Sequence, residues 1–436
     1  MSEEKFLFEE FKPISAQAWK EKIIRDLKGK DFSSLITPTL EGIEIQPFYH
    51  PDVYRSLDFT FQPSDFQTGY APETIENKAF LERLLEKKVD FIEWSLNAED
   101  FDLKFWQAYK NQMHFLARDS FSPVWEKIIH QGFSIYFDPL GNMVKGFESI
   151  DEEKWKMWVE FQNKNPKAHT LVDMTIYQNA GGNIITQLAL GLWQASEYVN
   201  RGVNPDKIEF KTAVGYHYFF EIAKLKTLRY LWHKISGVNP DRIIIRAEPS
   251  LRNKTVFDPY VNMLRTGMEM MAAVLGGANR MVNHPYNKVF AREEEKTIRW
   301  AVNQLHILKE EARINDYLSV LNGTYYIEHI AWELAEKTMK FLREQAGDKS
   351  FEQAWKNGFI RKLVDEDARK EQQLFDEGKL ILTGTNKYIN SEEKMPVIEK
   401  NVFSSTEPSE NEIIPLRVKR LSEEKEKERI SGMKKP

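Results

Sequence analysis

The sequence predicts an α/β protein built as a TIM-type (β/α)8 barrel, with an N-terminal helical and extended arm and a polar C-terminal tail. From about residue 89 onward, the 436-residue chain repeats a short apolar or β-branched run, a turn and a long amphipathic helix. Strands that alternate with helices indicate a mainly parallel sheet, because each parallel pairing needs a crossover connection. Seven such runs favour a barrel of eight strands. An open doubly wound sheet is the weaker alternative, because no strand is followed by G-x-G-x-x-G and no G-x-x-x-x-G-K-[ST] loop occurs.

Residues 1–88 are expected to form an arm that leads into the barrel. Between about Ser15 and Lys28, apolar side chains recur on one helical face opposite charged ones, which predicts a short amphipathic helix. The stretch from Thr37 to Pro72 contains prolines and is poor in strand signals, so we expect an extended conformation there. The sequence is equally compatible with docking of this arm on its own domain and with wrapping of a partner subunit.

Residues 89–390 are expected to form the barrel. The runs that predict its strands are Phe91–Leu96, Ser134–Phe137, Thr170–Thr175, Ile208–Val214, Ile243–Ala247, Asn279–Val282 and Leu380–Thr383. The clearest helices lie between these runs, where apolar residues recur every three or four positions, over residues 184–199, 219–235 and 260–275.

Residues 391–436 are expected to form a linker and tail. After Asn390 the chain is polar and free of strand signals. From Leu416 onward, basic residues outnumber acidic ones and few positions are apolar. We therefore expect a segment that is solvated or laid over a surface rather than a separate domain.

Composition excludes several classes of protein. The chain has no cysteine, which rules out disulfide scaffolds, thiolate zinc sites, iron–sulfur clusters and a cysteine nucleophile. Its 61 basic and 66 acidic side chains give a net charge of −5 with both signs interspersed, so nucleic acid is not an expected partner. The N-terminus does not resemble a signal peptide and no apolar run reaches 18 residues, so no membrane association is expected. These features favour a cytoplasmic protein.

A barrel of this type carries its site at the C-terminal ends of its strands, so the residues that follow each run are the candidates. They are Asp138, Gln178, Asn179, Tyr216, His217, Arg246, Glu248, Asn283 and His284. Paired carboxylates suit glycoside hydrolysis, with Glu248 beside Asp173 or Asp258. Carboxylates at strand ends are often structural, however, which makes this hydrolase an alternative rather than the leading hypothesis.

The other candidate motifs have structural explanations. A single histidine near aromatic residues, as at His217, is more often packed and hydrogen-bonded than catalytic. No H-x-x-x-H, H-E-x-x-H or C-x-x-C pattern is present, so no local metal site is predicted. The methionines around residue 268 have helical spacing, which core packing explains.

Four segments together resemble one enzyme family. Residues 258–279, Asp258-Pro-Tyr-Val-Asn-Met-Leu-Arg-Thr-Gly-Met-Glu-Met-Met-Ala-Ala-Val-Leu-Gly-Gly-Ala-Asn, resemble the acyl-CoA mutase stretch in which Asn-x-x-Arg-Thr leads into Ala-Val-Leu-Gly-Gly. Phe219-Phe-Glu-Ile-Ala-Lys-Leu-Lys resembles the family's Phe-Phe-x-Glu-x-Ala-Lys-x-Arg helix. Residues 303–311 with 322–328, and residues 381–388, resemble its Gln-x-Ile-Leu-x-Glu-Glu, Gly-Ser-Tyr-Tyr-Val-Glu and Val-Gly-Val-Asn-x-Tyr segments. The family is that of the adenosylcobalamin-dependent methylmalonyl-CoA mutases, and the resemblance implies a (β/α)8 barrel threaded by coenzyme A.

Two departures from the family pattern bear on catalysis. Catalytic chains carry Tyr-His-Met-Gln-Glu-Ala-Gly-Ala, whose His contacts the substrate, whereas residues 175–182 here read Thr-Ile-Tyr-Gln-Asn-Ala-Gly-Gly and place Ile176 at the His position. Isoleucine can donate neither a proton nor a hydrogen bond. The family's Gly-Gly-x-Gln-Ser-Leu-His-Thr-Asn becomes Gly276-Gly-Ala-Asn-Arg-Met-Val-Asn-His, in which Asn279 can still hydrogen-bond. We therefore expect no catalytic residue, and a degenerate barrel mouth that keeps Gln178, Asn179, Arg246, Glu248 and Asn279.

The resemblance also implies a cofactor and a partner. The cobalamin domain of the family has an Asp-x-His-x-x-Gly motif whose His ligates cobalt, and no His in this chain has an Asp two positions before it. We therefore expect adenosylcobalamin on a large catalytic partner subunit and none on this chain, which resembles a short form of the small subunit. The expected complex is a heterodimer that interconverts (R)-methylmalonyl-CoA and succinyl-CoA. A catalytic barrel of a related acyl-CoA mutase with a separate cobalamin chain is the alternative.

Overall fold

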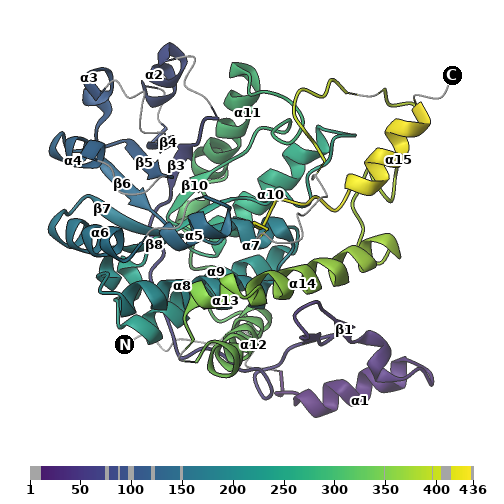
Figure 1. The fold of residues 1–436 in the computed structure, drawn as a ribbon. Helices are drawn as coiled ribbons and strands as arrows, with labels where there is room; N and C mark the ends of the chain where they lie inside the picture. The colour runs from purple at the N-terminus through teal and green to yellow at the C-terminus, as the bar shows by residue number, and fades with distance from the viewer. Residues whose placement is uncertain are drawn as a thin grey trace.

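The computed structural model describes residues 11–73, 78–86, 89–96, 103–118, 123–147, 151–347, 349–394, 396–403 and 414–433. Eight parallel strands form a closed barrel surrounded by helices (Figure 1). The predicted (β/α)8 fold class is confirmed.

The barrel strands lie in the order β10-β3-β4-β5-β6-β7-β8-β9. Their bounds are β3 Gln67–Tyr70, β4 Phe91–Leu96, β5 Met113–Ala117, β6 Ser134–Phe137, β7 Ala168–Asp173, β8 Ile208–Val214, β9 Ile245–Pro249 and β10 Arg280–Val282. The barrel closes between β3, the first of these strands in the sequence, and β10, the last, because Gln67 of β3 pairs with Arg280 of β10. A separate antiparallel pair, β1 (Thr37–Pro38) and β2 (Glu44–Ile45), precedes the barrel.

Three strand predictions were wrong. β3 lies in the stretch that was expected to be poor in strands, and β5 was not predicted at all. Leu380–Thr383 is not a strand, since Thr383 makes only an isolated bridge with Lys387 and Leu382 packs against Phe375 and Leu421. The segment expected to precede the barrel therefore supplies a barrel strand, although the division into three parts stays a prediction.

The helices that surround the barrel have buried inner faces. Their bounds are α2 Lys78–Glu86, α3 Leu103–Trp106, α4 Pro123–His130, α5 Pro139–Val144, α6 Glu152–Lys164, α7 Thr175–Ala180, α8 Ile184–Asn200, α9 Tyr218–Ser236, α10 Val261–Leu275, α11 Glu295–His306, α12 Tyr325–Phe341, α13 Phe351–Lys356 and α14 Phe359–Asp376. No helix of the described residues is long and apolar enough to cross a bilayer.

Strand β8 illustrates how the barrel is built. All seven of its residues are buried, because alternate side chains point to opposite faces of the sheet and both faces are covered. Phe210 points outward and meets Trp232 of α9, with ring centroids 5.3 Å apart. Glu209 and Lys211 point inward to partners on β4 and β9. The outer layer is therefore apolar, while the axis of the barrel carries charge.

The N-terminal arm begins with α1 (Ala16–Asp26), which lies apart from the barrel (Figure 1). Ala16 is the only residue of α1 that is buried, although Trp19 stacks on Phe48 of the arm at 4.9 Å. Further along, the backbone N–H of Arg55 donates to His329 Nδ1 at 3.1 Å and so ties the arm to α12.

The C-terminal segment ends in helix α15 (Glu423–Met433). Leu416, Leu421 and Ile430 are buried, although the composition of this segment predicted few apolar contacts. The sequence allowed either a solvated segment or one laid over a surface. The buried side chains show that residues 416–430 lie over a surface. The predicted polar stretch over residues 404–413 lies outside the described residues.

Candidate functional site

The barrel axis is filled by five charged side chains, called here the charge network: Glu93, Glu209, Lys211, Arg246 and Arg280. Arg246 Nη1 donates to Glu93 Oε1 at 2.8 Å, and Arg246 Nη2 lies 2.7 Å from Glu209 Oε2. Lys211 Nζ donates to Glu93 Oε2 at 2.7 Å, and Arg280 Nη1 donates to Glu209 Oε2 at 2.7 Å. These contacts link β4, β8, β9 and β10 across the interior, so the network replaces part of the apolar packing that usually fills such a barrel.

Aromatic rings fill the remaining space around the network. The guanidinium of Arg246 lies 3.9 Å from the centroid of the Tyr136 ring, and Tyr136 stacks on His169 at 5.0 Å. His114 stacks on Phe91, also at 5.0 Å. A Cβ atom at Gly69 would lie 2.2 Å from the Phe91 ring, so glycine is needed at this position of β3. The interior is therefore a packed core rather than an open channel.

The network holds its carboxylates in the charged form. Burial alone would raise the pKa of Glu93, but Lys211 and Arg246 lower it to about 2. The pKa of Lys211 is raised despite burial, because Glu248, Glu93 and Asp173 surround it. Burial lowers the pKa of His114 well below its usual value, and the nearby Arg246 lowers it further. The interior is thus an array of paired ions around neutral imidazoles.

Glu248, the carboxylate proposed for hydrolysis, lies at the end of the charge network that is nearest the barrel mouth. Its Oε2 lies 2.9 Å from Lys211 Nζ and 3.8 Å from His284 Nε2. Burial raises the pKa of Glu248, and Lys211 opposes that shift. Asp173 pairs with Lys145 at 2.5 Å, and that cation lowers its pKa to about 2 against the effect of burial. Glu248 and Asp173 are therefore each held by a lysine, as structural carboxylates are.

Asp138 closes the end of β6 in a structural role. Its Oδ1 accepts hydrogen bonds from the Gly141 backbone N–H at 3.0 Å and from the Tyr198 hydroxyl at 2.5 Å, and its Oδ2 accepts the Asp173 backbone N–H at 2.9 Å. This is the N-cap geometry of α5. Burial raises the pKa of Asp138. Its oxygens are occupied by protein donors.

Helix α7 corresponds to the catalytic segment of the family pattern, from which Ile176 and Asn179 depart and which Gln178 matches. Ile176 is buried in the hydrophobic core, where no polar group is required. Gln178 accepts a hydrogen bond from the Gln187 amide. Asn179 Oδ1 accepts the Leu251 backbone N–H at 2.8 Å and the Ser250 hydroxyl at 3.2 Å. Asn179 therefore fixes α7 to the loop after β9.

Two other predicted positions are structural tethers. Asn279 lies just before β10, at the opposite end of the barrel from the C-terminal strand ends, so its placement at the barrel mouth is corrected. Its Oδ1 accepts the Ile245 backbone N–H and the Arg229 guanidinium, both at 2.9 Å. Asn283 does follow β10, and its amide donates to Gln304 of α11 at 2.8 Å.

A cavity of about 630 Å³ lies beside the barrel mouth. The arm around Glu41, the Gly181–Gly182 turn, the loop at Tyr216 and His217, and α14 form its walls. Gln178 lines it and is the only one of the five predicted mouth residues that does. Burial raises the pKa of Glu41 and lowers that of His217. The cavity walls carry carboxylates and amides, with no described group of side chains suited to hold a metal ion.

Residues 416–426, called here the C-terminal strap, cross the mouth of the barrel. The Leu416 N–H donates to Val144 O at 3.0 Å and the Lys419 N–H donates to Asn179 O at 2.9 Å, so the strap touches the segments after β6 and β7. After β9, the Leu421 N–H donates to Arg252 O at 2.9 Å. Arg252 in turn donates to the Lys419 carbonyl at 2.6 Å.

Buried charges lock the strap in place. Arg420 Nη1 lies 2.7 Å from Glu426 Oε2, and both residues are less than 5% exposed. Glu426 Oε1 accepts the Val256 backbone N–H at 2.8 Å.

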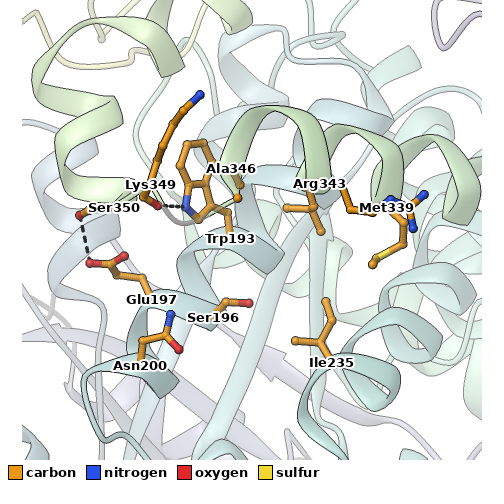
Figure 2. A pocket seen from close by; sticks show the side chains of 12 residues that line it. Trp193, Ser196, Glu197, Asn200, Ile235, Met339, Arg343, Ala346, Lys349 and Ser350 are labelled. Carbon is orange, nitrogen blue, oxygen red and sulfur yellow. Dashed lines mark hydrogen bonds between the residues drawn. The ribbon is translucent and has the colours of Figure 1, made fainter.

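A second cavity, also of about 630 Å³, lies at the far ends of α8, α9 and α12 (Figure 2). Trp193 forms one wall, and its Nε1–H donates to the Lys349 carbonyl at 3.0 Å. The Glu197 carboxylate is already paired with Arg201 at 2.9 Å and with the Ser350 hydroxyl at 3.1 Å. This cavity lies at the helix C-termini, away from the mouth, and contains none of the predicted site residues.

The comparisons with known proteins agree with the motifs. The methylmalonyl-CoA mutase family model matches residues 153–435. The methylmalonyl-CoA mutase small subunit of Porphyromonas gingivalis is 28% identical over 444 residues, which cover 89% of this chain and 72% of that protein. The methylmalonyl-CoA mutase of Cereibacter sphaeroides is 30% identical over 246 residues, covering 53% and 35%.

A third relative has a different substrate in its name. The 2-hydroxyisobutanoyl-CoA mutase large subunit of Aquincola tertiaricarbonis is 26% identical over 296 residues, which cover 63% of this chain and 51% of that protein. The matches thus span about a third of the Cereibacter sphaeroides mutase and about half of the Aquincola tertiaricarbonis large subunit.

Proposed function

This chain belongs to the methylmalonyl-CoA mutase family, and on that premise we propose that it is the small, non-catalytic subunit of a heterodimeric adenosylcobalamin-dependent methylmalonyl-CoA mutase. In this proposal the large subunit holds the cofactor and interconverts (R)-methylmalonyl-CoA and succinyl-CoA. The similarity to a small subunit over 89% of the chain supports this assignment. The glycoside hydrolase alternative gains no support from the family match.

The observation that carries the proposal is the filled barrel axis. A barrel that is threaded by an acyl-CoA needs a lumen, whereas Arg246, Tyr136 and the carboxylates around them occupy this one. Opening it would leave buried ions without partners, which is strongly unfavourable. The strap across the mouth and the buried Ile176 also support a non-catalytic barrel. The role that these features suit is mechanical support of a catalytic partner.

Coexpression with the candidate large subunit tests the proposal. Light scattering should give a one-to-one complex, and mutase activity should require the large chain and adenosylcobalamin. Calorimetric titration of this chain alone with methylmalonyl-CoA should show no binding. As a control, Ile176→Val in this chain should leave kcat of the complex unchanged. Turnover by this chain without the large subunit would contradict the proposal.

The similarity to the Aquincola tertiaricarbonis large subunit favours one second candidate, a catalytic acyl-CoA mutase barrel that works with a separate cobalamin chain. The same titration separates the two. Tight binding of an acyl-CoA to this chain would favour the catalytic barrel, and its absence would favour the supporting subunit.

A further inference from the structure

Helix α10 is apolar on the side that faces away from the barrel. Tyr260, just before the helix, and Leu264 and Met268 within it are spaced four residues apart and are 58%, 69% and 54% exposed. A helix on the outside of a barrel normally presents charged or polar side chains to water. Gly267 and Met271 complete the outer face, and the half-buried Arg265 at its edge directs its guanidinium to Thr383 O.

The elements that flank α10 extend this apolar surface. On one side, α11 is fixed to α10 by a hydrogen bond from the Gln304 amide to Met263 O at 2.6 Å, and its neighbour Ile307 is 47% exposed. On the other side, the Arg265 guanidinium donates to Thr383 O at 2.6 Å. That contact holds the loop that carries the exposed Ile381 and Tyr388. Helices α10 and α11 lie next to each other at the side of the barrel (Figure 1).

The size of this surface matches what a stable complex buries. We define the α10 patch as Tyr260, Leu264, Met268, Ile307, Ile381 and Tyr388. With roughly 200 Å² per fully exposed large side chain, their exposed fractions give on the order of 700 Å² of mainly apolar area. A standard protein–protein interface takes about 800 Å² from each partner, and soluble monomers rarely expose apolar patches this large.

We infer that the α10 patch is the surface on which the barrel of the large subunit docks, an inference that rests on the proposed function. Two barrels of one family can pair about a pseudo-twofold axis, which places like helices against each other. The outer face of α10 suits such a crossing of two helices, because Tyr260, Leu264 and Met268 form one apolar row with Leu264 at its centre. Gly267 has no side chain there, so a partner backbone can approach this part of the face closely; a Cβ atom at this position would lie 3.2 Å from the Gln304 amide nitrogen of α11.

The test uses full-length chains coexpressed with the large subunit. Leu264→Lys and Met268→Lys each place a charge in the patch and should weaken the complex at least tenfold in Kd, measured by surface plasmon resonance. The matched control is Met157→Lys, because Met157 on α6 is also exposed, at 42%, but lies outside the patch. All three side chains are exposed, so thermal unfolding of the isolated chains should be unchanged. That measurement separates lost docking from lost folding.

Each outcome is decisive. If wild type forms no complex with the large subunit, the proposed function fails and the inference fails with it. If wild type forms the complex and both patch variants bind as tightly as Met157→Lys, the inference alone is overturned. If the isolated chain is a homodimer that Leu264→Lys dissociates while the heterodimer is unaffected, the patch belongs to a second copy of this chain and the assigned partner is wrong.

Discussion

Replacing Arg246 by methionine should lower the free energy of unfolding by about 3 kcal/mol. Arg246 is 1% exposed and contacts both Glu93 and Glu209, at 2.8 and 2.7 Å. Removing one partner of a buried ion pair generally costs about 3–5 kcal/mol, because the other charge stays buried without compensation. We expect the lower end of that range, since Glu93 keeps Lys211 and Glu209 keeps Arg280, each at 2.7 Å.

Urea unfolding followed by circular dichroism measures this loss directly. Arg280→Met is the matched control, because its side chain is 19% exposed and its ion pair among the described residues is with Glu209, beside hydrogen bonds to Gln67 and Tyr136. We expect a smaller loss there, about 1 kcal/mol. The loss for Arg246→Met should shrink between pH 7 and pH 5. Without Arg246 the pKa values of the two glutamates rise, so they take up protons in the folded state and shed the uncompensated charge.

Two results would refute this reasoning. An Arg246→Met chain as stable as wild type would mean that the network is solvated rather than buried. A loss larger than about 3 kcal/mol that stays constant between pH 7 and pH 5 would mean that lost packing on Tyr136, rather than charge, dominates at this position.

Three further predictions follow from the geometry. Glu426→Gln should loosen the strap, because it leaves the buried Arg420 without its counter-charge. Proteases should then cut within residues 416–426 at least tenfold faster, while the rate of cleavage elsewhere stays unchanged. Gly69→Ala should lower stability by about 1–3 kcal/mol in a denaturant titration, since its Cβ would meet the Phe91 ring, and equal stability would contradict the packed axis. His114 is held neutral by burial, so stability falls as the pH drops below about 6.5, where the unfolded chain takes up the proton first. His114→Phe should reduce the stability difference between pH 7 and pH 5 by up to about 2 kcal/mol, and an unchanged difference would show that this imidazole is protonated in the fold.

Periodicity located the barrel well but failed where strands are short. The runs at β4, β6 and β8 were predicted with their observed bounds, because they are continuous apolar or β-branched segments between turns. β3 reads Gln-Thr-Gly-Tyr over four residues, too short and too polar for a period of two to be visible. Its pairing with β10 is a tertiary effect that no local pattern encodes.

The interior of the barrel had a signal that the sequence reasoning did not use. Glu209 and Lys211 alternate with apolar residues in a strand buried on both faces, and Glu93 and Arg246 do the same in β4 and β9. A charge in such a strand must face a partner inside the barrel, because burial of an unpaired ion is prohibitive. Which ion meets which depends on the register of strands far apart in sequence.

The C-terminal strap could not have been predicted from composition. Its charged residues suggest solvation, yet Arg420 and Glu426 are buried because they satisfy each other and the backbone of the loop after β9. By contrast, the presence of Ile176 at the family's His position could be predicted from the sequence motif alone.

The closure of the barrel by β3 and β10 has a consequence for how the chain folds during synthesis. The paired positions Gln67 and Arg280 are 213 residues apart. At a translation rate of about 5–20 residues per second, β3 waits roughly 10–40 s on the ribosome before its last neighbour emerges. An unpaired strand edge invites association with other nascent chains. β3 and β10 have only four and three residues, and such short strands offer few backbone groups to a wrong partner during that interval.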